Sequence, residues 1–116
     1  MTPAKKALDS AADAGKPAPL ARTTVHYYYP YLAKDGKHKF YIVTKTEKKI
    51  YFGAAGYSDF TKHKDEARKQ RYIKRHEKNE DWSKSGIDTA GFWSRWLLWH
   101  KPSIKESYED IKKRFL

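Results

Sequence analysis

Hydrophobic and polar residues alternate over short stretches in the first half of the chain, a pattern typical of β-strands with one buried face. Residues 39–44 place Phe40 and Ile42 on the same face, and residues 49–52 repeat the alternation. Residues 23–29 are rich in β-branched and aromatic side chains, which favours a first strand that ends or becomes an edge at the following proline. Turn signals separate these stretches, so we expect an antiparallel β-meander of about three strands.

The second half of the chain has the apolar spacing of helices instead. Residues 64–78 contain neither glycine nor proline and are rich in helix-forming residues. Residues 90–100 follow two capping residues and end before a proline, and residues 104–115 repeat apolar side chains at helical spacing. We therefore predict an α+β fold, in which the small antiparallel meander is followed by about three helices.

The first 22 residues differ in composition from the rest of the chain. They contain no aromatic residue, and they end in a segment that includes Pro17 and Pro19. This composition predicts an extended N-terminal arm or linker over residues 1–22, which we expect to lie on a partner. Residues 23–116 are then expected to form a single small α+β domain.

The chain is strongly basic, with 25 Lys and Arg against 14 Asp and Glu and a formal net charge of +11. An excess of this size favours nucleic acid or acidic protein surfaces as partners. The charge is spread over the whole chain. The longest strongly apolar stretch, residues 91–99, is far shorter than a transmembrane helix, so we expect a soluble protein with no membrane-spanning segment.

Residues with catalytic or metal-binding chemistry are few. The absence of cysteine excludes disulfides, thiol catalysis and cysteine-type zinc sites. The five histidines do not pair at helical spacing, and nothing marks a nucleophile with its base. We expect no catalytic residue, no metal, no cofactor and no small-molecule substrate, and we predict that the protein is not an enzyme.

The predicted helix over residues 64–78 carries the densest positive charge. Arg68, Arg71 and Arg75 share one of its faces, which Lys69 and Lys74 flank. Arginine binds phosphates and carboxylates through two parallel hydrogen bonds, so these five residues are a candidate site for a polyanion or an acidic partner. The alternative is a solvated helix whose arginines pair with nearby carboxylates. The carboxylates within reach along the chain are Asp65, Glu66, Glu77 and Glu80.

The predicted helix over residues 90–100 is apolar over most of its circumference. Phe92, Trp96 and Trp99 form one stripe, and Trp93 extends the stripe around the helix. Such a helix either fills a core or lies against another chain, where tryptophan often anchors an interface. We expect these aromatic residues to be core, because the chain has few aliphatic residues to fill one.

Tyrosines cluster on the first predicted strand. Tyr27 and Tyr29 fall on one face of that strand and Tyr28 on the other, with Tyr31 close behind. Aromatic side chains on a strand of a basic protein can stack on nucleic-acid bases. The alternative, which we favour, is one face in the core and one amphipathic surface.

Several runs in the second half of the chain carry a resemblance. They are FGAAGYSDFTKHKD over residues 52–65, RKQRYIKRH over residues 68–76 and AGFWS over residues 90–94, with Trp82, Trp99 and residues 101–103 as further matches. Over residues 50–116 the chain resembles a family of short basic proteins of large icosahedral double-stranded DNA viruses, the relatives of chlorella viruses and mimiviruses. The resemblance implies a virus-encoded protein packaged in the particle, and it carries over no active-site residue.

Two functions are compatible with these features. The first is a minor capsid or capsid-interior protein that bridges other capsid proteins, located in the virion and, during assembly, in the host cell cytoplasm. The second is non-specific binding of the viral genome, with the arginine face on phosphates. We expect the first, because the charge is dispersed and because an extended arm suits a bridging protein.

Overall fold

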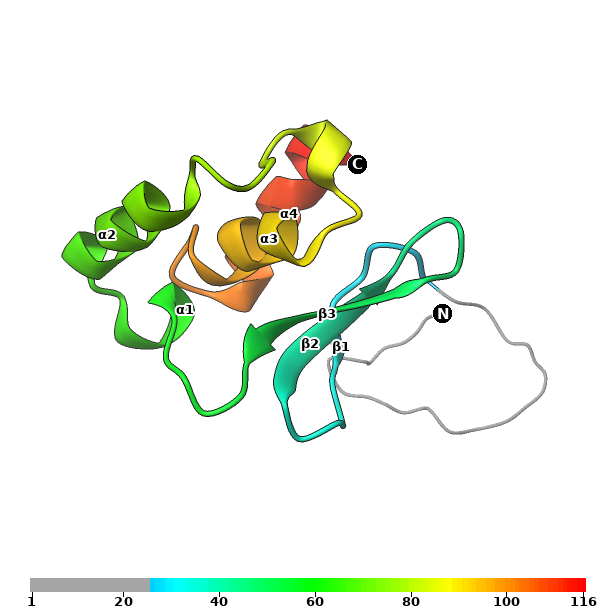
Figure 1. Ribbon diagram of the computed structural model, residues 1–116, viewed down its shortest axis with the longest axis horizontal. Helices are drawn as coiled ribbons and strands as arrows, with labels where there is room; N and C mark the ends of the chain where they lie inside the picture. The colour runs from blue at the N-terminus through cyan, green and yellow to red at the C-terminus, as the bar shows by residue number, and fades with distance from the viewer. Residues whose placement is uncertain (1–25) are drawn as a thin grey trace. The chain divides into compact units, whose positions relative to one another are not determined.

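The computed structural model describes residues 26–116 and has the predicted α+β class (Figure 1). A three-stranded antiparallel sheet comes first and the helices follow, so the predicted order of elements is confirmed. The described residues divide into two compact units, one that ends at Ala55 and one that runs from Gly56 to Leu116. The expected N-terminal arm, residues 1–22, lies outside the described residues.

The first unit is a meander in which each strand pairs with the next. The strands are β1 (Tyr31–Leu32), β2 (His38–Val43) and β3 (Lys49–Ala54). Phe40 lies opposite Phe52, and Ile42 lies opposite Ile50. Phe40, Ile42 and Phe52 are all buried, as the alternation predicted for one face of the sheet.

Among the described residues, the first strand begins later than the sequence predicted, after Pro30, and residues 26–29 of the predicted strand are not in a strand. Tyr28 has a φ of 59°, a left-handed conformation that is incompatible with a regular strand. Its amide still donates to the Val43 carbonyl oxygen at 2.9 Å, which fastens this turn to β2. Tyr27 and Tyr29 therefore do not form one face of a strand, and that prediction is wrong.

The opposite face of the sheet carries one tyrosine from each strand, and we call these three residues the tyrosine row. Tyr31 lies opposite Tyr41, and Tyr41 lies opposite Tyr51. Their ring centroids are 5.5 Å apart in the first pair and 5.2 Å apart in the second. The Lys49 ammonium lies 5.1 Å from the centroid of the Tyr41 ring, a cation–π distance. The row thus combines aromatic surface with positive charge.

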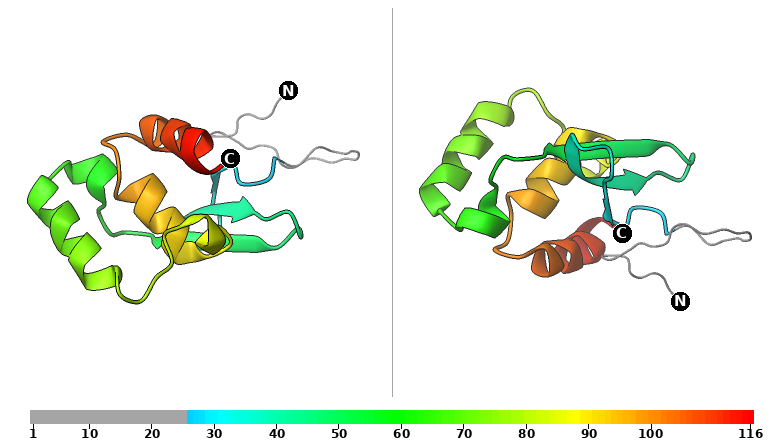
Figure 2. Two further views of the ribbon diagram at one scale, coloured as in Figure 1. Left: turned by 90° about the horizontal axis from the view of Figure 1, so that it is seen from above. Right: turned by 90° about the horizontal axis from the view of Figure 1, so that it is seen from below.

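The second unit contains the helices. They are α1 (Phe60–His63), α2 (Glu66–His76), η2 (Lys84–Gly86), α3 (Ala90–Trp93), η3 (Ser94–Leu98) and α4 (Ile104–Phe115). Three helical stretches of this unit correspond to the three predicted helices, whereas α1 and η2 are short additions that the apolar spacing did not predict. Within the unit, α4 packs against η3 (Figure 2).

The segment η3 is π-helical. The α-helix predicted over residues 90–100 therefore changes to a π-helix after Trp93. Thr89 caps α3 by accepting a hydrogen bond from the Phe92 amide at 3.3 Å. In η3, the Trp99 amide donates to the Ser94 carbonyl oxygen, five residues earlier, at 3.1 Å. Phe92 and Trp93 are fully buried, and the adjacent Leu97 and Leu98 are both buried as well.

Candidate functional site

Helix α2, which carries the five candidate residues, is fixed at its start by a carboxylate. Asp65 Oδ1 accepts hydrogen bonds from the amides of Ala67 and Arg68 at 3.0 and 3.3 Å. These bonds satisfy amide groups that have no partner within the helix, and the negative charge complements the helix dipole. Basic residues occupy the last turn, where the dipole favours positive charge. The local sequence therefore favours a helix in this place.

One face of α2 packs into the second unit through aromatic contacts. Tyr72 is buried, and its ring lies parallel to that of Trp99, with an interplanar angle of 3° and 4.5 Å between centroids. The Trp82 ring is also nearly parallel to the Tyr72 ring, at 6.3 Å. Burial raises the pKa of Tyr72 above its usual range, so the hydroxyl stays neutral at physiological pH. The stack holds α2 at a fixed angle of rotation about its axis.

The face of α2 beside the packed one is exposed and positively charged. Arg68, Arg71, Lys74 and Arg75 are all exposed, and we call these four residues the basic surface. Among residues 26–116, no ion pair joins any of them to a carboxylate. Three unpaired guanidinium groups on one rigid helix can bind phosphate or carboxylate groups of a partner.

Most of the carboxylates close to α2 along the chain make other contacts. Asp65 caps the helix, and Glu66 accepts a hydrogen bond from Gln70 at 2.7 Å. Glu80 accepts from His76 and from the Trp82 indole, both at 2.9 Å. The alternative in which these carboxylates neutralise the arginines of α2 is therefore not what this structure has.

Lys69 does not belong to the basic surface, although the sequence placed it beside the arginines. Its ammonium donates to the His100 carbonyl oxygen at 2.7 Å and lies 4.8 Å from the centroid of the Phe60 ring. Burial lowers the pKa of Lys69, and the nearby Arg95 lowers it further. Lys69 precedes Tyr72 by three residues, but Arg75 follows Tyr72 at the same spacing and is exposed, so helical spacing alone did not place Lys69 on the packed face.

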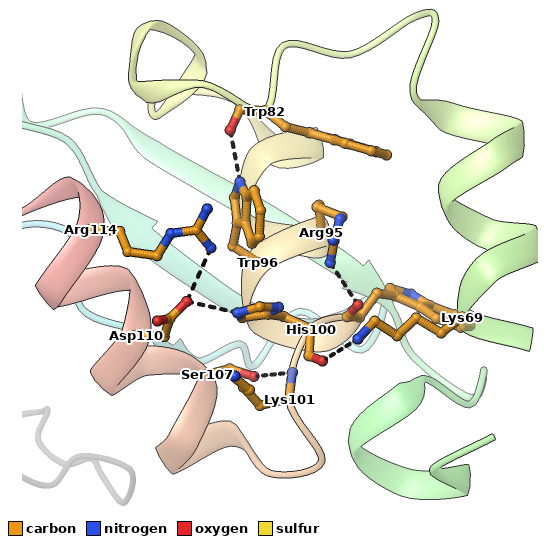
Figure 3. A network of polar contacts seen from close by, with 10 residues as sticks. Lys69, Trp82, Arg95, Trp96, His100, Lys101, Ser107, Asp110 and Arg114 are labelled. Atoms are coloured by element: carbon orange, nitrogen blue, oxygen red, sulfur yellow. Dashed lines mark hydrogen bonds and ion pairs between the residues drawn. The ribbon is translucent and has the colours of Figure 1, made fainter. Parts of the chain in front are cut away.

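A polar network links the helices of this unit around Trp96 (Figure 3). The Trp96 indole N–H donates to the Trp82 carbonyl oxygen at 2.8 Å. The guanidinium groups of Arg95 and Arg114 lie 4.3 and 4.4 Å from the centroid of the Trp96 ring. Arg95 also donates to the Trp99 carbonyl oxygen at 2.8 Å, and burial lowers its pKa. These two arginines stabilise the fold, unlike those of the basic surface.

His100 and Asp110 form the most enclosed ionisable pair in the network. His100 Nε2 lies 2.7 Å from Asp110 Oδ2, and Arg114 donates to the same oxygen at 3.2 Å. A carboxylate only accepts hydrogen bonds, so we assign the proton of the neutral imidazole to Nε2. His100 Nδ1 is then unprotonated, and it is buried without a hydrogen-bond partner. The sequence did not single out this pair, because its members lie ten residues apart on different elements.

Opposing effects set the pKa values of this pair. Burial lowers the pKa of His100 below its usual value, and this effect outweighs the attraction of Asp110. Burial alone would raise the pKa of Asp110, but the hydrogen bonds from His100 and Arg114 lower it overall. The pair therefore holds a neutral imidazole beside an ionised carboxylate at neutral pH.

The part of the chain that the structure describes contains neither a metal-binding cluster nor a membrane-spanning helix. Within residues 26–116, no three histidine, aspartate or glutamate side chains come together as a metal site requires. No helix in the same range has the length and apolar character needed to cross a bilayer.

The fold and the site define a small basic α+β protein with an exposed arginine face. Residues 31–76 match the model of a family described as a family of unknown function (DUF5754). The matched stretch contains the three strands and the whole of α2, so the tyrosine row and the basic surface both lie within it. Neither the curated proteins nor the solved structures include a significant match to the chain.

Proposed function

We propose that this chain is a non-enzymatic structural component of a virus particle, a minor capsid or capsid-interior protein that bridges other components of the virion. The observation that carries the proposal is the division of the chain into two compact units with different surfaces. One unit has the tyrosine row with Lys49, and the other has the basic surface of α2. A bridging protein needs two contact surfaces, and each unit offers one.

Charge supports a structural role of this kind. The net charge of +11 on 116 residues attracts the chain to acidic surfaces over distances of about one Debye length, roughly 8 Å at physiological salt. Positive charge is present on both units, for example at Lys49 on the sheet and at Arg71 on α2. A chain with charge on both units can hold two acidic neighbours at once.

The resemblance of residues 50–116 to short basic proteins of large DNA viruses supports placing the protein in a virion. That stretch includes α2 and the whole second unit, so the part of the chain that carries the resemblance is also the part that carries the basic surface.

Mass spectrometry of purified particles, with and without genome, tests this proposal directly. We expect the protein in both preparations, at a constant ratio to the major shell protein. Absence from washed particles would contradict a structural role. If the protein is lost from the particles when the genome is removed, it is not also bound to shell proteins, and a bridging role would be contradicted.

Cross-linking of intact particles tests the bridging itself. Lys48 and Lys49 report on the first unit, whereas Lys62 and Lys74 report on the second. We expect lysine-reactive cross-links from the two pairs to reach different neighbours. Cross-links from both units to one surface of a single neighbour would show that the protein binds one partner and does not bridge two.

A further inference from the structure

We propose that the partner of the basic surface of α2 is the phosphate backbone of a nucleic-acid duplex, bound without regard to base sequence. This inference rests on the proposed function, because it names the partner of one of the two surfaces of the bridge. The chain would then connect the packaged genome to the protein shell. The proposal follows from three properties of α2: its unpaired charge, its lack of exposed large apolar side chains and its rigidity.

The first property is the density of unpaired positive charge. Arg68, Arg71, Lys74 and Arg75 are exposed without a carboxylate partner among the described residues, and Lys62 and Lys78 are exposed on either side of the helix. Binding of a duplex releases the counterions that its phosphates had condensed, which favours association in proportion to the number of phosphates contacted. An exposed surface of this composition binds a polyanion without first breaking ion pairs of its own.

The second property, the lack of exposed large apolar side chains on α2, distinguishes a nucleic-acid partner from an acidic protein partner. Within residues 26–116, the large apolar side chains that are exposed are those of Tyr27, Leu32, Tyr57 and Leu116. None of these four residues lies in α2. Protein–protein interfaces have a largely apolar centre with aromatic anchors, whereas interfaces with nucleic acid are more polar and much more positively charged. The composition of this face therefore favours nucleic acid.

The spacing of the arginines is compatible with a duplex, which presents more phosphates over this length than the helix has arginines. Arg68 and Arg75 are seven residues apart, which is about 10 Å along a helix axis. A DNA duplex presents about six phosphates over the same length, and a single strand presents about half as many. Each guanidinium then finds a phosphate within reach in almost any register, so binding does not depend on base sequence.

The third property is rigidity, which limits the entropy lost on binding. The Asp65 cap fixes the start of α2, and the stack of Tyr72 on Trp99 fixes its packed face. The helix backbone is therefore ordered before a partner arrives. Only the side chains of the basic surface have to be immobilised, because the structure already orients that surface outward.

Salt titration of DNA binding by the full-length chain tests the proposal, with a random-sequence DNA duplex as the probe. The test variant is Arg68→Gln/Arg71→Gln/Arg75→Gln. The matched control is Lys101→Gln/Lys105→Gln/Lys113→Gln, which removes the same charge from three exposed positions that have no ion pair among the described residues, two on α4 and one just before it. We expect the α2 variant to flatten the slope of log K against log salt by about two to three units, and the α4 control to flatten it by less than about one unit.

A variant that keeps the charges tests whether a loss of DNA binding is caused by loss of charge or by misfolding. Arg68→Lys/Arg71→Lys/Arg75→Lys keeps all three charges, so it should keep most of the salt dependence while its thermal melt stays that of the wild type. Equal flattening by the α2 and α4 triple variants would show that only net charge matters, and it would overturn the proposal. Tighter binding of polyglutamate than of duplex DNA, near 150 mM salt as a roughly physiological value, would identify an acidic protein partner instead.

Each of the two experiments can contradict one proposal without contradicting the other. If the protein is absent from particles but the α2 variant, unlike the α4 control, loses its salt-dependent DNA binding, the structural role is contradicted and the nucleic-acid site is supported. If the protein is present in particles but the α2 variant binds DNA as the wild type does, the nucleic-acid site is contradicted and the structural role is supported.

Discussion

Trp96 donates its indole N–H to the main-chain carbonyl oxygen of Trp82, 14 residues earlier in the chain, at 2.8 Å. This bond attaches the segment after α2 to the π-helical segment η3 (Figure 3). The same ring lies against the guanidinium groups of Arg95 and Arg114, the second of which comes from α4. Trp96 thus contacts three parts of the second unit, although it is only half-buried.

Replacement of Trp96 by alanine should therefore unfold much of the second unit. Truncation of a large aromatic side chain costs about 3 kcal/mol or more, a large share of the total stability of a small domain. Thermal unfolding followed by circular dichroism measures the loss. Trp96→Phe is the matched control, because it keeps an aromatic ring and loses the hydrogen bond. Loss of the hydrogen bond should lower the stability by about 1 kcal/mol, in addition to the loss caused by the smaller buried area of the ring. A wild-type melting temperature in Trp96→Ala would contradict this stabilising role.

Lys69 and Lys74 lie on the same helix, yet their replacement should have different effects. Lys69→Met keeps an apolar stem and removes the hydrogen bond to His100, so we expect a loss of about 1 kcal/mol in stability. Lys74→Met should leave stability unchanged, because this side chain is exposed, and should flatten the salt dependence of DNA binding by about 0.9 units. Thermal melts and salt titrations of both variants separate the two roles. A stability loss in Lys74→Met and none in Lys69→Met would reverse the assignment.

The second unit should lose stability as the pH falls below neutrality. Burial lowers the pKa of His100 from its usual 6.5, so below this pH the unfolded chain binds a proton that the folded chain resists. The stability from neutral His100 is fully present above pH 6.5 and is lost as the pH falls through the lowered pKa. Asp110 acts in the same direction at lower pH, because its pKa is also lowered.

His100→Gln isolates the contribution of the imidazole. Its amide can still donate to Asp110, but it does not titrate, so the melting temperature should depend less on pH between about 7 and 5. Melts of wild type and variant across that range, in one buffer series, provide the measurement. An unchanged pH dependence in the variant would show that the acid sensitivity does not come from His100.

Gly86 should not tolerate a side chain, although its backbone conformation is an ordinary one. A Cβ atom added at this position would lie 1.9 Å from the Asp81 carbonyl oxygen, so the main chain itself would have to move. We expect Gly86→Ala to cost about 2 kcal/mol or more in thermal or denaturant unfolding. Gly91→Ala is the comparison, because its Cβ would meet only the carboxyl end of Glu80, and its cost should be smaller. Equal losses of stability in the two variants would mean that the main chain around Asp81 can move aside at little cost in free energy.

The strands β2 and β3 could be predicted because burial on one face of a sheet leaves a period of two in the sequence. Phe40, Ile42 and Phe52 follow that period and are buried. The first strand could not be placed in the same way. Tyrosine is common in strands, but the positive φ of Tyr28 depends on the turn that its amide makes with Val43, a contact between distant parts of the chain.

The candidate site was predicted in part for a similar reason. Helical spacing alone places Arg68, Arg71 and Arg75 on one face, and the structure leaves that face exposed. Helical spacing does not by itself say which neighbouring face is packed, and this is why Lys69 was grouped with the arginines. The pairing of His100 with Asp110 was beyond prediction from spacing, because it depends on how α4 packs against η3.

The π-helical segment η3 also affects how related sequences should be aligned and shortened. A π-turn holds one residue more than an α-turn, and each residue of an α-helix turns the chain by about 100°. Removal of one residue from Ser94–Leu98, with a return to an α-turn, would therefore leave the residues that follow at about the same angle around the helix axis. Trp99 would then keep its position against Tyr72, and the packed face of α2 would keep its support. A relative that lacks one residue here should therefore have an α-turn in this place and the same ring partner for Tyr72.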